Sequence, residues 1–134
     1  MSRRTARPTK PVSTCPCGLS EPYEKCCGRY HSGGAVAPTA EALMRSRYSA
    51  FVKGDRAYLL RTWHPRTRPA RLDLDPDMTW TGLEVLGATE GSAFHSSGTV
   101  TFRASYRGGS LHERSRFERA DGVWVYVDGE FLGE

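Results

Sequence analysis

The first half of the chain carries apolar residues at helical intervals. Between residues 39 and 54 they recur on one side of a helix, at Met44, Tyr48, Phe51 and Val52, which predicts a buried face. Thr39 is the expected N-cap, with Glu41 favourably placed in the first turn, and Gly54 is expected to end the helix.

A second and shorter helix is predicted directly after the first. Asp55 is its expected N-cap, and it should run to about Trp63, because Pro65 cannot continue a helix. Residues 66–76 contain two further prolines and predict an irregular crossing loop.

The second half of the chain alternates apolar and polar residues and predicts four antiparallel strands. Their expected ranges are 78–86, 98–106, 111–119 and 123–128, with turns at Gly108-Gly109 and Asp121-Gly122. Two helices followed by such a meander predict an α+β fold, in which a curved antiparallel sheet wraps on the helices and leaves a hollow at its open end.

The four cysteines of the chain form one tight cluster, C-P-C-G-L-S-E-P-Y-E-K-C-C-G, at Cys15, Cys17, Cys26 and Cys27. Four thiolates fit a closed tetrahedral metal site, which leaves no position for water or substrate. Pro16 and Gly18 favour a tight turn around the first pair, and residues 22–25 predict one helical turn that delivers the second. Zinc is the preferred ion, and iron with four sulfur ligands is the alternative. His31 is a spare ligand, expected to lie outside a shell that four sulfurs complete.

Disulfide and redox chemistry explain the cluster less well. A bridge within either pair would be strained, because one residue or none separates its cysteines. The C-x-x-C pattern of thiol oxidoreductases is absent. Residues 2–10 are basic and polar and contain no apolar signal-peptide core. The expected location is therefore the reducing cytoplasm.

Two stretches of the sequence are similar to known families. C-x-C-x8-C-C, with Pro16, Gly18, Tyr23 and Gly28, resembles the SEC-C zinc motif, which is found at the tail of the SecA translocation motor and in many small bacterial proteins. Downstream, residues 37–52, 58–65, 112–119 and 124–129 resemble the bacterial YchJ-like family. This resemblance implies a zinc knuckle followed by a nuclear-transport-factor-two-like (SnoaL-like) cone, and it implies no particular activity.

Charge and glycine content divide the 134 residues into three predicted regions. Residues 1–14 contain four basic residues and no acid. They account for the whole net charge of +4, so residues 15–134 have no net charge. This tail is expected to be disordered and solvated, and no nucleic-acid partner or membrane span is expected. The knuckle is predicted at 15–32 and the cone at 33–134. The joint Ser32-Gly33-Gly34 suggests that the cone folds without the knuckle.

Five residues are candidates for the lining of the hollow: Arg47, Tyr48, Trp63, His64 and Glu113. Arg47 shares a helix face with Leu43 and Phe51, so its charge should be partly buried and should meet a carboxylate. Glu113 is the first candidate for this carboxylate, because it alternates with inward-facing Leu111 and Phe117; Asp128 is the second.

Three functions are compatible with these patterns. The preferred interpretation is a binding or adaptor protein, whose knuckle recognises a protein or ribosome-associated partner, by analogy with SEC-C proteins, and whose cone holds a ligand. The second is a small enzyme with its active site in the cone, although no catalytic triad, P-loop or dinucleotide motif supports one. The third is a metal-handling protein with an exchangeable thiolate cluster.

Overall fold

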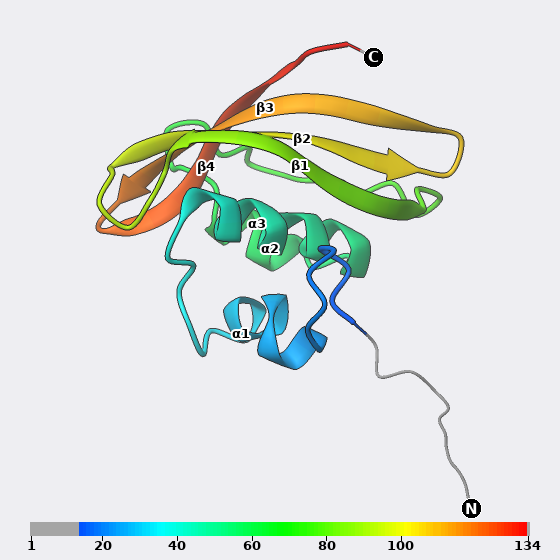
Figure 1. Cartoon of the computed structure of the whole chain (residues 1–134), viewed down its shortest axis with the longest axis horizontal. Helices are drawn as coiled ribbons and strands as arrows, with labels where there is room; N and C mark the ends of the chain where they lie inside the picture. The colour runs from blue at the N-terminus through cyan, green and yellow to red at the C-terminus, as the bar shows by residue number, and fades with distance from the viewer. Residues whose placement is uncertain (1–13, 134) are drawn as a thin grey trace, which may run out of the picture.

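The computed structural model describes residues 14–133 and forms a four-stranded sheet over one side of the helices (Figure 1). The tail predicted at 1–14 lies outside the described residues, except for Thr14. In chain order the elements are the 3-10 turn η2 (Tyr23–Lys25), α1 (Cys27–His31), α2 (Ala40–Lys53), α3 (Arg56–Arg61), β1 (Trp80–Glu90), β2 (Ser97–Tyr106), β3 (Gly109–Ala120) and β4 (Val123–Phe131). The predicted α+β fold is confirmed.

The two longer helices begin where their capping residues predicted. The Thr39 hydroxyl accepts a hydrogen bond of 3.0 Å from the Ala42 N–H at the start of α2, and the Asp55 carboxylate accepts one of 3.1 Å from Tyr58 at the start of α3. Gly54 ends α2 with a φ of 71°, a left-handed conformation that glycine adopts without strain.

The strands form an antiparallel meander in the order β1-β2-β3-β4. All four are longer than predicted, and the largest extensions are at the ends of β1 and β4. β1 continues past residue 86 because residues 87–90 still pair with β2, and β4 continues past 128 because residues 129–131 pair with β3. Backbone pairing thus extends both strands beyond the alternating stretches by which they were recognised.

The segment that follows α3 pairs with the outer edge of β4. His64 donates a backbone hydrogen bond of 2.7 Å to Tyr126, and the Tyr126 N–H donates one of 2.8 Å to Thr62. At the same place β4 contains a bulge, because Arg116 pairs with Asp128 whereas Phe117 pairs with Tyr126. The extra residue, Val127, turns Tyr126 and Asp128 to opposite faces of the sheet.

Helix α2 lies between the sheet and α1 (Figure 1). The main core joins α2 and α3 to the inner face of the sheet through Leu43, Met44, Leu59, Val100, Phe117 and Trp124. The Trp124 indole N–H donates to the Pro38 carbonyl at 3.2 Å, which fixes the start of α2 on the sheet. Among residues 14–133, no helix is long and apolar enough to cross a membrane.

Candidate functional site

The four cysteine side chains converge on one point. Their sulfur atoms all lie within 4.8 Å of one another, and Cys17 and Cys26 are 3.6 Å apart. A tetrahedral site with metal–sulfur bonds of about 2.3 Å needs sulfurs about 3.8 Å apart. All four residues are at most 5 % exposed. The cluster therefore has the donor set, the spacing and the burial of a closed metal site.

Short backbone contacts shape the two loops that carry these cysteines. Cys15 donates to the Glu21 carbonyl at 2.8 Å, and Gly18 donates to Cys15 at 3.3 Å with a φ of 96°, a conformation that favours glycine. Gly28 also has to be small, because a Cβ there would lie 2.7 Å from the Tyr23 carbonyl oxygen. The predicted helical turn before the second pair is present as η2.

The knuckle is attached to α2 rather than separate from it. The Arg45 guanidinium donates to the Cys17 carbonyl at 2.7 Å, and the Cys15 sulfur lies 3.5 Å from the Ser49 hydroxyl oxygen. Leu83 of β1 packs against the cysteines. The joint at residues 32–34 predicts that the cone folds without the knuckle. In the folded chain, contacts distant in sequence connect the two.

His31 supports the knuckle without facing the metal position. Its Nε2 contacts the Ser46 carbonyl at 2.8 Å, and its Nδ1 lies 2.6 Å from the Tyr23 hydroxyl. Because a carbonyl can only accept, Nε2 carries the proton, and in the neutral ring Nδ1 accepts from Tyr23. Both nitrogens are thus occupied, which agrees with the expected role of His31 as a non-ligand.

Without a metal, the cluster favours the thiolate at Cys17 over those at Cys26 and Cys27. The hydrogen bond from Cys27 is the main cause that lowers the pKa of Cys17 to about 5, against the effect of burial. Burial, and then the hydrogen bond with Cys17, raise the pKa of Cys26 to about 12. For Cys27 the hydrogen bond with Cys17 is the larger cause and burial the second, and both raise its pKa. A bound dication would have to displace the remaining thiol protons, so metal binding should release protons.

A second site lies between α2 and the inner face of the sheet. It is a cavity of about 310 Å³ with mainly apolar and aromatic walls. Four of the five predicted pocket residues line it: Arg47, Tyr48, Trp63 and Glu113. The other lining residues are Met44, Phe51, Met78, Trp80, Phe102, Ala104, Leu111, Ser115, Phe117 and Tyr126.

Arg47 is buried, as expected, but makes no ion pair with Glu113. Among the described residues no carboxylate oxygen lies within 4.0 Å of it. Its Nη1 instead donates to the Leu59 carbonyl and to the Thr62 hydroxyl, both at 2.7 Å. Burial lowers the pKa of Arg47 to about 10, so the guanidinium stays charged at neutral pH. Carbonyl and hydroxyl oxygens at the end of α3 replace the predicted carboxylate.

Glu113 is held on the other side of the cavity. The Ser115 hydroxyl donates to its Oε2 at 2.8 Å, and its carboxylate lies over Gly129 of β4. Burial raises the pKa of Glu113, while Ser115 and the charge of Arg47 partly oppose this shift. The missing side chain at Gly129 therefore creates the space in which the carboxylate lies.

Gly129→Ala is expected to displace the Glu113 carboxylate, because a Cβ at this position would overlap it. The free energy of unfolding should fall by about 0.5–1.5 kcal/mol, because the displaced carboxylate loses the hydrogen bond from Ser115. Gly87→Ala in β1 is the control, since a Cβ there meets no atom within 4 Å. Urea denaturation of both variants measures the difference, and equal stabilities would contradict this placement of Glu113.

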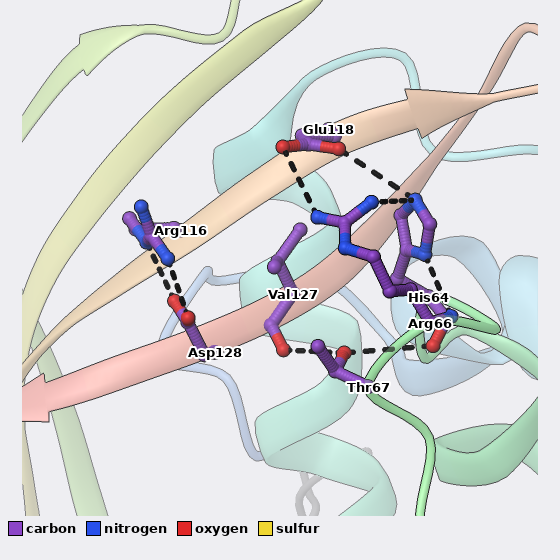
Figure 2. Close-up of polar contacts among 7 residues, drawn as sticks. All are labelled: His64, Arg66, Thr67, Arg116, Glu118, Val127 and Asp128. Atoms are coloured by element: carbon purple, nitrogen blue, oxygen red, sulfur yellow. Dashed lines mark hydrogen bonds and ion pairs between the residues drawn. The ribbon is translucent and has the colours of Figure 1, made fainter.

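His64, the fifth predicted pocket residue, lies elsewhere (Figure 2). Its Nε2 is 3.6 Å from a Glu118 oxygen, and its Nδ1 accepts the Arg66 backbone N–H at 3.0 Å. Pairing with Tyr126 holds the His64 backbone at the sheet edge and leaves its ring beside β3. Asp128, the second candidate partner of Arg47, also lies outside the cavity. It is on the outer face of the sheet, where Arg116 Nε donates to it at 2.6 Å.

Two residues that contact Arg47 were not predicted as its partners from the sequence. Tyr126 belongs to an alternating stretch, but the bulge at Val127 cannot be recognised in that alternation. Thr62, which accepts from Arg47, lies at the end of α3 and had no distinguishing pattern. The Tyr126 ring centre is 4.5 Å from the guanidinium carbon of Arg47, and that of Trp63, which was predicted, is 5.1 Å away.

Comparisons with known proteins agree with this architecture. The family model described as YchJ, middle NTF2-like domain, matches residues 39–129. A UPF0225 protein from Streptomyces coelicolor is 80 % identical, over 91 % of this chain and 98 % of its own. One from Corynebacterium glutamicum is 50 % identical, over 87 % and 95 %.

Two solved structures have the same fold, and both are described as SEC-C motif containing proteins. The solution structure from Rhodopseudomonas palustris is 37 % identical with a TM-score of 0.78, and covers 90 % of this chain and 100 % of its own. The crystal structure from Psychrobacter arcticus is 30 % identical with a TM-score of 0.73, and covers 92 % and 85 %.

Proposed function

Since the chain belongs to the UPF0225 family, with a YchJ-type NTF2-like domain and a cysteine cluster that can hold a metal, we propose that it is a zinc-stabilised binding protein. Its ligand is a small molecule that occupies the cavity between α2 and the sheet. The observation that carries this proposal is the cavity itself, about 310 Å³ in volume and walled mainly by apolar side chains. Sites for small molecules commonly have volumes of about 300–1,000 Å³ and this composition.

Zinc in this proposal is structural. Four sulfur ligands complete its tetrahedral shell, so that no position is open for a substrate. The burial of all four cysteines and their attachment to α2 favour a static site over an exchangeable metal store. The reduced thiols that such a site requires fit a cytoplasmic protein.

The purified protein is expected to contain one zinc per chain, and Cys26→Ser/Cys27→Ser should contain almost none. Elemental analysis of both measures this, and visible absorbance tests for iron, which colours a four-sulfur site. Full zinc occupancy in the double variant would disprove the assignment of these ligands. Ser20→Ala, an exposed residue of the same loop, is the control.

Binding in the cavity is tested with small aromatic compounds. Trp63 and Trp80 line it, so a bound aromatic compound should change tryptophan fluorescence. Ala104→Phe should abolish this change, because Ala104 is 2 % exposed and a larger side chain there would fill the cavity. Leu86→Phe, at a residue that is 42 % exposed, is the control. Equal binding by the wild type and by a folded Ala104→Phe variant would rule out the cavity as the site.

Partner recognition by the knuckle is a second part of the proposal, and Leu19 is the observation that favours it. This apolar residue is 44 % exposed on the turn between the two cysteine pairs. Leu19→Asp should weaken binding to a protein partner and leave the zinc content unchanged. Unaltered partner binding by this variant would argue against the knuckle as a recognition surface.

A further inference from the structure

The cavity has a hydrogen-bonding requirement that its own residues do not meet. Most of its wall is apolar, and its two charged residues are Arg47 and Glu113. Arg47 supplies only N–H donors. A ligand that fits the cavity therefore has to place an acceptor group near Arg47.

Arg47 is a fixed donor with unused capacity. Its two hydrogen bonds to protein both start from Nη1, and the rings of Trp63 and Tyr126 hold the guanidinium at centre distances of 5.1 and 4.5 Å. A guanidinium carries five N–H donors in a planar fork that matches a carboxylate. No carboxylate among the residues of 14–133 occupies that fork.

We infer that the ligand is a small planar carboxylic acid, whose carboxylate binds at Arg47 and whose ring system lies among the apolar walls. This inference rests on the proposed function of the cavity. Phe51, Trp80 and Phe102 provide the aromatic surfaces. The volume of about 310 Å³ is at the lower end of the range for small-molecule sites and limits the ligand to about one or two rings.

Because of Glu113, the affinity of the cavity should depend on the charge of the ligand. Its carboxylate shares the cavity with Arg47 and would repel a bound anion, whereas it would attract a bound amine. Glu113→Gln should therefore tighten the binding of an acid and weaken the binding of an amine. This change in sign distinguishes a carboxylate ligand from a cationic one.

The test compares three compounds with the same ring system: 2-naphthoate, 2-naphthamide and 2-naphthylmethylamine, titrated by calorimetry into the full chain. The naphthoate should bind at least about tenfold more tightly than the amide, because charge-assisted hydrogen bonds are roughly twice as strong as neutral ones. Arg47→Lys keeps the positive charge but removes the planar fork, and should weaken naphthoate binding about five- to tenfold. Thermal melts establish that each variant is folded.

Each outcome decides between the two proposals. Tightest binding of the naphthoate, with losses in Arg47→Lys and gains in Glu113→Gln, supports the carboxylate site. Equal or tighter binding of the amide or the amine overturns it and leaves the cavity as a binding site. Binding of none of the three by the wild-type protein overturns both this inference and the proposed function.

Discussion

Removal of the metal is expected to destabilise α2 together with the knuckle. Zinc binding to small cysteine motifs contributes about 10–16 kcal/mol of apparent free energy, and here the cysteine loops are connected to α2 through Arg45, Ser49 and Ser46. The free energy of unfolding should therefore fall by at least about 5 kcal/mol on chelation, part of it from α2.

Hydrogen exchange with and without a chelator locates this effect. Peptides from residues 15–31 and from α2 should both lose protection, while β3 and β4 keep more of theirs. Arg45→Ala is the comparison, because it removes the bond to Cys17 but none of the cysteines. In this variant, chelation should affect α2 less. If loss of protection stopped at residue 31 in the wild type, the knuckle would be an independent unit, as the joint at residues 32–34 had suggested.

Arg47→Ala is expected to lower the free energy of unfolding by about 3 kcal/mol, at the upper end of the ordinary range for single substitutions. The change removes two hydrogen bonds that join α2 to the end of α3. It also removes the cation between Trp63 and Tyr126 and leaves a void beside them.

Chemical denaturation of three variants tests this structural role. Thr62→Ala removes one of the two acceptors and should reduce stability by about 1 kcal/mol. Arg71→Ala is the control, because the Arg71 side chain is 83 % exposed and its pairing with Asp73 should contribute little. An Arg47→Ala protein as stable as Arg71→Ala would show that Arg47 does not hold the two helices together.

Local sequence determined the elements and the cysteine cluster that can hold a metal. Thr39, Gly54 and Asp55 act within one turn of their own position, so they set the helix boundaries wherever the helices pack. The spacing of the four cysteines likewise requires only short loops to bring the sulfurs together. The alternation in β3 placed Glu113 correctly on the inner face, because no bulge interrupts β3 between Leu111 and Phe117.

The tertiary structure decided which of these elements meet. A one-residue bulge at Val127, invisible in the alternation, put Asp128 with Arg116 outside and Tyr126 beside Arg47 inside. Pairing of residues 62–64 with β4 carried His64 out of the cavity and brought Thr62 to Arg47. The joint at residues 32–34 gave no indication of the hydrogen bond by which Arg45 of α2 contacts Cys17 of the knuckle. Sequence periodicity reports the face of a residue within its own element, whereas partners across elements depend on register and packing between segments far apart in the chain.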